Sequence, residues 1–399
     1  MKVTTVGLGY IGLPTSALIA SKEIEVNGVD VDQNVVNTIN KGEIHIVEPD
    51  LDKVVKDVVD RGFLKASSSV MMGDVYLIVV PTPFKGNHEP DISFIEAATE
   101  SVIPLLKNGD LYIIESTSPI GTTEKMRDLI LESRPELKNL YFAYCPERVL
   151  PGNVLHELVY NDRVIGGVDE ESTHFASEFY KKFVEGELHQ TDAKTAEMCK
   201  LVENASRDVQ IAFANELSFI CDKANVDVWK LIELANKHPR VNILQPGCGV
   251  GGHCIAVDPY FIVSDFPEES KIIRAARDIN NNKVDWCVKK IRETKDSFKK
   301  MNGYDPKIAI FGLSFKPNID DLRESPAVSI AEKVLHSNNE GIFIVEPNIE
   351  SHKSFDLTDH LTAFERAEII CFLVAHDQFK YFENTTGKII LDFCGALNN

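Results

Sequence analysis

A glycine-rich turn close to the N-terminus restricts the possible folds of this chain more than any other feature. It follows an apolar run over residues 2–6, which predicts a strand, and leads into small and apolar residues over 14–20, which predict a helix. The glycines have the spacing G-x-G-x-x-G: Gly7, Gly9 and Gly12. A second predicted strand over 26–30 ends on Asp30, roughly twenty residues after the turn. This order predicts a doubly wound α/β domain with a parallel sheet.

The same turn predicts a dinucleotide site. Gly7 permits a tight turn, Gly9 lets the backbone approach a pyrophosphate, and Gly12 lets the helix pack closely on the strand. Amides at the helix N-terminus then face the phosphates. Asp30 is placed to bind a ribose diol and to repel a 2′-phosphate, so the predicted cofactor is NAD rather than NADP. The alternative is a doubly wound fold whose glycine turn binds another ligand. The predicted cofactor contacts in this segment are Gly7, Gly9, Tyr10, Ile11, Gly12 and Asp30.

Further predicted strands in the N-terminal part end in polar turns. They cover residues 75–80, 111–115 and 141–144. Because ligands bind beyond the carboxyl ends of parallel strands, Thr82 and Thr117 are placed to meet cofactor or substrate. Helix capping is the alternative for these threonines. Glu147 follows the third strand and is well placed for chemistry, with a surface ion pair to Arg148 as the alternative.

A second glycine-rich loop, over residues 246–259, carries a thiol. Gly251 and His253 stand just before Cys254, and Asp258 follows four residues after it. Glycines allow the backbone to bend sharply and a ligand to come close. A thiol together with a hydride acceptor indicates oxidation through a covalent sulfur intermediate.

Two long helices are predicted in the middle of the chain, over residues 193–226 and 270–300. Lys200, Glu203 and Asn204 share one face of the first, at i, i+3 and i+4. A solvated face on a scaffold helix is the alternative interpretation. Helices of this length often form the spine between two α/β domains, or a dimer interface.

Near Asp305 a second α/β pattern begins. Its predicted elements are strands over 307–311, 342–345, 369–374 and 388–392 and a helix over 326–335. It lacks the full glycine fingerprint, which predicts a ligand different from that of the first domain. Lys316 and Arg323 lie just past its first strand, where phosphates are held, with ordinary surface charge as the alternative.

Composition excludes some classes of partner. The formal net charge of -19 argues against a nucleic acid or an anionic membrane. The eight cysteines include no CxxC pair, so we expect reduced thiols in a cytoplasmic protein and no metal site. The first residues read as a strand rather than a signal peptide, and no apolar run is long enough to span a bilayer.

Together these motifs resemble those of the nucleotide-sugar 6-dehydrogenases, over almost the whole chain. The motifs are Gly7-x-Gly9-x-x-Gly12, Ser116-Thr117, Pro146-Glu147-Arg148, Lys200-x-x-x-Asn204, Gly251-Gly252-His253-Cys254 with Asp258, and Phe315-Lys316-Pro317 with Arg323-Glu324-Ser325. The run 246–254 looks like the N-acetylhexosamine branch, whereas UDP-glucose enzymes more often have Ser before the Cys. The run 147–152 looks most like the UDP-N-acetylmannosamine enzymes, with UDP-N-acetylglucosamine as the closest alternative.

The resemblance implies three domains and a homodimer or higher homo-oligomer. They are a Rossmann NAD domain over 1–192, a central helical dimerisation domain over 193–300 and a C-terminal Rossmann-like UDP-sugar domain over 301–399. Family members often carry a further short segment, so contacts made by such a tail are left open.

The resemblance also implies a four-electron oxidation of the sugar C6 alcohol, through the aldehyde to the carboxylate, with two NAD molecules used in turn. Cys254 would form a thiohemiacetal and then a thioester, which Glu147 helps to hydrolyse. A water held by Lys200, Asp258 and Thr117 would take the hydroxyl proton. The implied catalytic residues are Cys254, Lys200, Asn204, Asp258, Glu147 and Thr117.

For binding, the resemblance implies that Lys316 contacts UDP, that Arg323 contacts NAD, and that Arg240 reaches the substrate from a partner subunit. Thr82 and Thr117, placed at the strand ends, are the further predicted cofactor contacts. His253 is implied to assist binding of substrate or cofactor, and packing is the alternative role for its side chain. The implied substrate contacts are Glu147, Arg148, Val149, Lys200, Asn204, Arg240, Gly251, His253 and Lys316.

Two other functions fit part of the sequence. A two-electron dehydrogenase of the 6-phosphogluconate or 3-hydroxyacid type would need neither Cys254 nor the C-terminal domain. A non-catalytic NAD-binding sensor would keep the glycine turn and lose the polar residues. NADH released per sugar separates them: two for the proposed route, one for the simple dehydrogenase and none for the sensor.

Overall fold

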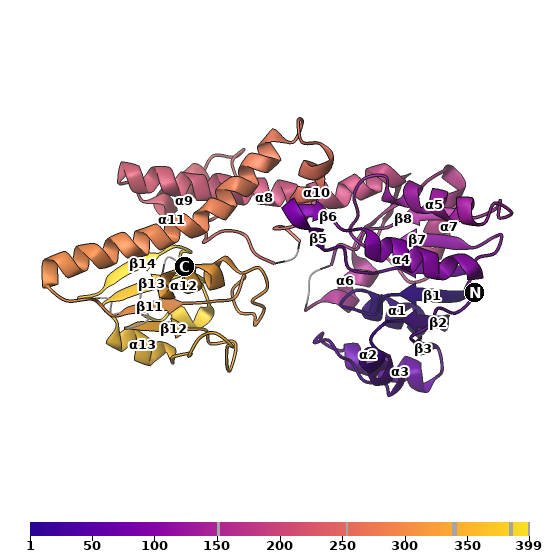
Figure 1. Ribbon diagram of the computed structural model, residues 1–399, viewed down its shortest axis with the longest axis horizontal. Coiled ribbons are helices and arrows are strands. Elements are labelled where there is room, and N and C mark those ends of the chain that lie inside the picture. Colours follow the sequence, from indigo (N-terminus) through magenta and orange to yellow (C-terminus); the bar gives the residue numbers. More distant parts are fainter. Residues whose placement is uncertain (150–151, 253, 337–340, 383–385, 398–399) are drawn as a thin grey trace. The chain divides into compact units, whose positions relative to one another are not determined.

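The computed structural model describes residues 1–149, 152–252, 254–336, 341–382 and 386–397 (Figure 1). The chain forms two compact units. Unit 1 comprises Met1–Val202 and Tyr260–Asp265, and unit 2 comprises Glu203–Pro259 and Phe266–Asn399. The three-domain division therefore stays a prediction in its boundaries.

Unit 1 is built on an eight-stranded sheet with the order β10-β9-β8-β7-β4-β1-β2-β3. Neighbouring strands are parallel, except that β8 pairs antiparallel with β9. The chain changes direction across the sheet at β1, between β2 and β4, which is where doubly wound folds bind ligands. The strands are β1 (Lys2–Val6), β2 (Glu25–Val29), β3 (Leu64–Ser67), β4 (Val75–Ile78), β7 (Leu111–Ile114), β8 (Tyr141–Tyr144), β9 (Arg163–Gly167) and β10 (Leu188–Asp192).

Helices connect these strands, and a short hairpin follows β4. The helices are α1 (Gly12–Ser21), α2 (Gln33–Asn40), α3 (Leu51–Asp60), α4 (Ser93–Val102), α5 (Thr122–Ser133), α6 (Val154–Tyr160) and α7 (Glu170–Tyr180). The hairpin consists of β5 (Phe84–Lys85), η1 (Gly86–His88) and β6 (Glu89–Pro90), and η2 (Ile103–Leu105) follows α4. Asp32 and Asp169 begin α2 and α7 by accepting hydrogen bonds from backbone amides of the first turn.

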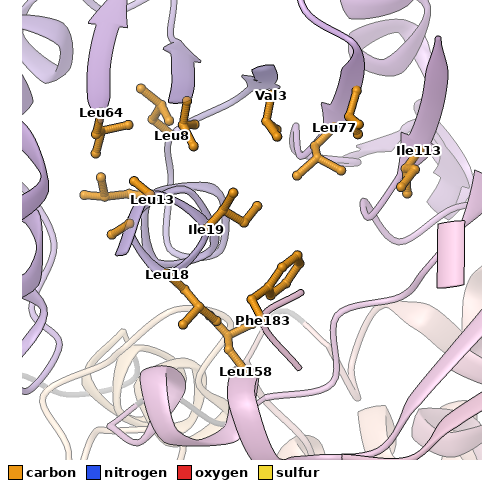
Figure 2. Packing of buried hydrophobic residues seen from close by; sticks show 14 of the residues in the cluster. Val3, Leu8, Leu13, Leu18, Ile19, Leu64, Leu77, Ile113, Leu158 and Phe183 are labelled. Atoms are coloured by element: carbon orange, nitrogen blue, oxygen red, sulfur yellow. The ribbon is translucent and has the colours of Figure 1, made fainter. Parts of the chain in front are cut away.

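Helix α1 is buried over almost its whole length, which fixes the turn before it. Leu13, Leu18 and Ile19 lie in one cluster with Val3 of β1 and Leu77 of β4 (Figure 2). An apolar helix of this kind has no solvent face, so it must pack between the sheet and a second layer. The N-terminus of α1 is therefore held against the carboxyl end of β1.

Unit 2 combines long helices with a second parallel sheet. Its sheet has the order β12-β11-β13-β14. In Figure 1 these strands lie beside α11 and α12. The elements are α9 (Val228–Ala235), α11 (Lys271–Asn302), β11 (Ile308–Phe311), α12 (Pro326–Leu335), β12 (Ile342–Val345), α13 (His360–Arg366), β13 (Ile369–Phe372), η3 (Asp377–Phe379) and β14 (Ile389–Asp392). Helices α8 (Ala193–Ala224) and α10 (Asp258–Asp265) have residues in both units.

The α/β architecture predicted from the sequence is confirmed. β1, β8, α12 and β12 have the predicted bounds, and α8 and α11 match the two long predicted helices to within two residues at each end. Strands β9 and β10 were not predicted. β9 opens with Arg163 and β10 carries exposed polar residues, so neither has the apolar run that marks a buried strand. No helix within the described ranges is long and apolar enough to cross a membrane.

Candidate active site

The three glycines of the first turn have different steric surroundings. Gly7 has φ +99°, and a Cβ there would lie 2.2 Å from the Val79 carbonyl oxygen. A Cβ on Gly12 would lie 1.9 Å from the carbonyl oxygen of Gly7. At Gly9 a Cβ would meet no heavy atom of the described residues within 4 Å. Two glycines thus serve packing, and the third leaves an open approach to the backbone, as a pyrophosphate site requires.

This difference predicts separate effects of alanine at Gly7 and Gly9. Gly7→Ala is expected to lower the free energy of unfolding by at least about 2 kcal/mol, because the left-handed backbone and the Val79 carbonyl both oppose a side chain. Gly9→Ala is expected to leave Tm nearly unchanged and to weaken NAD binding by about tenfold, or ~1.4 kcal/mol. Thermal unfolding and NAD titration of both variants check this. Equal losses of Tm would contradict it.

Asp30 holds the turn from the end of β2. Its carboxylate accepts hydrogen bonds from the backbone amides of Leu8 at 3.0 Å and Asp32 at 2.9 Å. A carboxylate has about four acceptor positions, so further positions remain for a ribose diol. Tyr10 and Ile11 lie in the turn between β1 and α1, and the Tyr10 side chain is exposed.

The turns after β4 and β7 are joined by side-chain hydrogen bonds. The Thr82 hydroxyl donates to the Thr117 carbonyl oxygen at 2.7 Å. The Ser116 hydroxyl accepts from the Val80 amide at 2.9 Å and donates to the Val80 carbonyl at 2.7 Å. Neither threonine caps a helix, because Ile92 and Gly121 precede α4 and α5. The two predicted contact residues therefore lie together at the carboxyl edge of the sheet.

The side chain of Lys200 contacts the backbone of Glu147. The Lys200 ammonium donates to the Glu147 carbonyl oxygen at 2.7 Å, and the Glu147 carboxylate accepts a short hydrogen bond from the Val149 amide. Glu147 is buried, so its alternative role in a surface ion pair with Arg148 is wrong. Arg148 donates instead to the Asp162 carbonyl oxygen at 3.4 Å.

The surroundings of Glu147 favour a carboxyl that can hold a proton. Burial raises the pKa of Glu147, and the positive charges of Lys200 and Arg163 oppose this rise. Arg163 is itself buried, beside Glu115 and Tyr180. The Tyr180 hydroxyl donates to Glu115 at 2.5 Å. A buried polar cluster thus lies behind Glu147, and a perturbed carboxyl of this kind is typical of a catalytic acid or base.

Glu197 fixes helix α8 relative to the Thr117 turn. This buried carboxylate accepts from the Gly121 amide at 2.5 Å and from the amide and hydroxyl of Thr123 at 2.8 and 2.7 Å. It therefore caps the N-terminus of α5 from another helix, where a negative charge is stabilised. Lys200 lies three residues after Glu197 on α8, so the cap also sets the position of the lysine.

In unit 2, Asn204 and Asp258 are brought together. The Asn204 side-chain amide donates to the Asp258 carboxylate at 2.6 Å. Asp258 begins α10, and its amide donates to the Cys254 carbonyl oxygen at 2.8 Å. Cys254 itself is exposed. Hydrogen bonds therefore link the Cys254 backbone, Asp258 and the Asn204 side chain into one hydrogen-bonded segment.

The first turn of the C-terminal sheet repeats the construction of the N-terminal one. Gly312 has φ +94°, and its amide donates to the last residue of β12, as Gly7 donates to the last residue of β2. Glu346 accepts from the Leu313 amide at 2.7 Å, in the place that Asp30 has beside Leu8. Glu346 differs in being sealed by buried His376, at 3.0 Å. The turn is thus Rossmann-like, with its carboxylate withdrawn from solvent.

The cations predicted near this turn are exposed. Lys316 follows the turn, and Arg323 forms hydrogen bonds with both oxygens of the Asp321 carboxylate. Arg240 is exposed after α9, and its backbone amide donates to His238 at 3.3 Å. Gly251 lies in the cysteine loop against Phe315. His253 lies outside the described residues.

Sequence reasoning missed three groups that position these side chains: Glu197, Arg163 and the pair Glu346–His376. Nothing in the local sequence marks them. Glu197 and His376 each contact a residue at least 30 positions away in the sequence. Arg163 lies in strand β9, which has no apolar pattern. Only the fold brings each of them to the turn or helix that it contacts.

Comparisons with known proteins give matches along most of the chain. The UDP-glucose/GDP-mannose dehydrogenase family matches in its NAD-binding domain over residues 1–184, its central domain over 194–282 and its UDP-binding domain over 309–399. A UDP-N-acetyl-D-mannosamine dehydrogenase of Campylobacter jejuni is 51% identical, covering 98% of this chain and 99% of its own. An NDP-N-acetyl-D-galactosaminuronic acid dehydrogenase of Ralstonia nicotianae is 49% identical, covering 98% of this chain and 95% of its own.

Among solved structures, a UDP-D-ManNAc dehydrogenase from Pyrococcus horikoshii has a TM-score of 0.89 and 38% identity, covering 98% of this chain and 99% of that chain. Both the sequence matches and the structural match extend over nearly the full length. This chain therefore belongs to the UDP-glucose/GDP-mannose dehydrogenase family and is an NAD-dependent UDP-sugar dehydrogenase.

Proposed function

We propose that this enzyme oxidises UDP-N-acetyl-D-mannosamine at C6 to UDP-N-acetyl-D-mannosaminuronate. The observation that carries the proposal is the hydrogen-bonded segment of Cys254, Asp258 and Asn204 in a chain that also has the NAD turn. The choice of sugar is supported by the run 147–152 and by relatives of that activity. UDP-N-acetylglucosamine and UDP-glucose are the alternative substrates.

The turn over residues 7–12 fits NAD, because its Gly9 backbone is open and Asp30 retains acceptor positions. Bound NAD supplies the hydride acceptor for both oxidations. Thr82 and Thr117 line the same edge of the sheet, and Arg323 is the proposed cation for NAD from unit 2.

The first oxidation needs a base for the C6 hydroxyl proton. We assign this to a water held by Lys200, Asp258 and Thr117. The C6 carbon loses a hydride and the hydroxyl loses a proton, leaving an aldehyde. Lys200 and Asn204, one turn apart on α8, stabilise the negative charge that develops on oxygen, an effect often worth about 3 kcal/mol for one donor.

The second oxidation uses Cys254. Its thiolate adds to the aldehyde carbon and the oxygen takes a proton, which gives a thiohemiacetal. Loss of a second hydride and of the hydroxyl proton gives a thioester. Water then adds to the carbonyl carbon with Glu147 as the base, the C–S bond breaks, and the carboxylate leaves. Sulfur keeps the aldehyde bound and makes the second hydride loss feasible.

The substrate is held by groups from several loops. We assign the UDP moiety to Lys316 and the sugar to the remaining predicted contacts. Those are Glu147, Arg148, Val149, Lys200, Asn204, Gly251 and His253. Cations near a diphosphate are expected on electrostatic grounds.

The eight cysteines are free thiols, which supports the proposed cytoplasmic location.

We further propose a homodimer in which Arg240 acts on the partner's substrate. The support is exposed apolar side chains on the central helices: Phe213 and Ile220 of α8 and Leu234 of α9 are 53%, 55% and 57% exposed. Phe213 and Ile220 lie two turns apart, so they form one stripe. Large exposed apolar residues that gather in this way mark interfaces.

Mixed dimers test this arrangement. Cys254→Ala and Arg240→Ala homodimers are each expected to be inactive. Random mixing is expected to restore about a quarter of the wild-type sites, because half of the dimers are mixed and each has one intact site. Activity after joint refolding or co-expression measures this. No recovery, with mixed dimers verified by two affinity tags, would mean that Arg240 acts within its own subunit.

The proposed reaction is tested by incubating the purified protein with UDP-N-acetylmannosamine, UDP-N-acetylglucosamine and UDP-glucose in parallel. We expect acid from the first sugar with two NADH per acid. One NADH with no acid would indicate a two-electron dehydrogenase. A higher kcat/KM for another sugar would reassign the substrate and leave the chemistry unchanged.

A further inference from the structure

A buried polar network joins helix α8 to helix α11. Asp208 and Asn215 of α8 and Arg277 and Asn280 of α11 are all buried. Arg277 donates to the Asp208 carboxylate at 2.6 Å. The Asn280 amide donates to the same oxygen at 2.8 Å and to the Asp208 carbonyl oxygen at 3.1 Å. Asn215 donates to the Asn280 side-chain oxygen at 2.9 Å. Four side chains thus form one continuous chain of hydrogen bonds.

The network ends on the loop that carries Cys254. The Asn215 side-chain oxygen accepts the backbone N–H of Gly247 at 2.9 Å. Because the amide nitrogen of Asn215 is engaged by Asn280, the orientation of its oxygen is fixed. The loop also passes directly beside α11: a Cβ on Gly249 would lie 3.0 Å from the Asn280 carbonyl oxygen. The loop therefore leaves the central helices from a defined point.

The following residues of the loop are held by the C-terminal sheet domain. The Cys248 thiol donates to the Leu373 carbonyl oxygen at 3.3 Å, and the Gly252 amide donates to the Arg323 carbonyl oxygen at 3.2 Å. A Cβ on Gly251 would lie 2.7 Å from Cβ of Phe315. Between Gly247 and Gly252 the loop is thus fixed on two sides, directly before the exposed thiol.

Stability alone does not account for this network. Burial raises the pKa of Asp208 even beside Arg277, which reflects the cost of enclosing a carboxylate. Apolar residues would join α8 to α11 at least as well as a buried ion pair. Directional hydrogen bonds in a buried polar network instead specify one arrangement of the groups that they join, although the second Asp208 oxygen has no hydrogen-bond partner among the described residues. Here the group at its end is the backbone of the cysteine loop.

We propose that Asn215, held by Asn280, is a positioning residue that places the Cys254 thiol to capture the aldehyde before it is released. This rests on the proposed function. The two oxidations make different demands on the loop: aldehyde formation does not use sulfur, whereas capture requires the thiol at the aldehyde carbon. A loosened loop uncouples the second oxidation from the first.

Asn215→Ala tests the proposal by a split between the two oxidations. We expect the first hydride transfer in single turnover to stay within about threefold of wild type, and acid formation to fall by about tenfold or more. Free aldehyde is expected to appear as a semicarbazone when semicarbazide is present. KM for the sugar and for NAD is expected to change little. Wild-type enzyme is expected to release no trappable aldehyde.

Ser218→Ala is the matched control. Ser218 lies one turn along α8 and is buried; it accepts a hydrogen bond from Lys283 of α11 at 2.5 Å and donates to the Asn215 backbone carbonyl at 2.5 Å, so its removal leaves the Asn215 side-chain bonds to Asn280 and Gly247 in place. Its removal is expected to lower Tm without releasing aldehyde. Equal aldehyde release by Ser218→Ala, or a parallel loss of both oxidations in Asn215→Ala, would overturn the proposal.

Two further variants keep the test decisive. Asn215→Asp keeps an oxygen for the Gly247 amide but loses the donor to the Asn280 oxygen and turns a second acceptor toward it, so it is expected to release aldehyde as Asn215→Ala does; tight coupling in folded Asn215→Asp would contradict the proposal. If Asn215→Ala does not fold, Asn280→Ser replaces it and is judged by the same aldehyde release. A wild-type enzyme that forms no acid at all would instead refute the proposed function.

Discussion

Cys254→Ala is expected to reduce acid formation by at least about 10³-fold while leaving NAD binding unchanged. The thiol is exposed, and its carbonyl accepts the amide of Asp258, so its loss removes the nucleophile without disturbing a packed core. The first oxidation does not require sulfur, so a trace of aldehyde is expected to persist. NADH release, acid quantified by chromatography, and NAD titration measure the three effects.

Cys221→Ala is the control for loss of a thiol. Cys221 is buried on α8 within unit 2, and we expect its replacement to alter Tm but not the ratio of two NADH per acid. Iodoacetamide should inactivate wild type by modification of Cys254, with protection by the sugar nucleotide. If Cys254→Ala made acid at the normal rate, the thioester route would be wrong and the carboxylate would have to arise from a hydrated aldehyde.

The sequence predicted those parts of the fold whose cause is local. The turn at Gly7, Gly9 and Gly12 was assigned three distinct steric roles, and the space available to a Cβ at each position agrees with all three. β1 and β12 were predicted with their observed bounds, because apolar runs between turn residues leave few alternatives. The glycine turn and these strands depend on residues adjacent in the sequence, so a single sequence is enough to predict them.

The remaining features of the site depend on contacts between distant residues. The cap that Glu197 forms on α5 spans 74 residues to Thr123, and the bond between Asn215 and Asn280 spans 65. A buried Arg163 in β9 cannot be recognised from a strand that lacks an apolar pattern. Predicting such groups requires knowing which helices and strands are neighbours, and that follows only from the fold.

The two turns of the two sheets show how one construction serves different ligands. Asp30 and Glu346 each directly follow the strand next to the first strand of the sheet, and each accepts a hydrogen bond from the amide after a left-handed glycine. Asp30 remains partly exposed, whereas His376 closes Glu346 off. We infer that the carboxylate of the second turn has kept its structural role and is withdrawn from ligand contact. This agrees with a UDP-binding rather than an NAD-binding domain.

Glu147→Gln is expected to trap the enzyme as a thioester. The glutamine keeps the shape of the side chain and can still accept from the Val149 amide, but it cannot serve as the base for the attacking water. We expect a burst of two NADH per active site, followed by turnover that is slower by about 10²- to 10⁴-fold. Intact-mass spectrometry is expected to show one sugar nucleotide bound to Cys254. Glu115→Gln, which removes another buried carboxylate at the same sheet edge, is expected to give no adduct.

The pH dependence of turnover gives a second test of the same role. Burial raises the pKa of Glu147 above the ordinary value of 4.5, against the opposing charges of Lys200 and Arg163. A base acts only when deprotonated, so hydrolysis-limited turnover should rise as the pH increases through this raised pKa and then level off. The E147Q variant should lack this rise, because its amide does not titrate. If E147Q retained the same rise and formed no adduct, the base would have to be another group, and Glu147 would serve only to orient the backbone that Lys200 contacts.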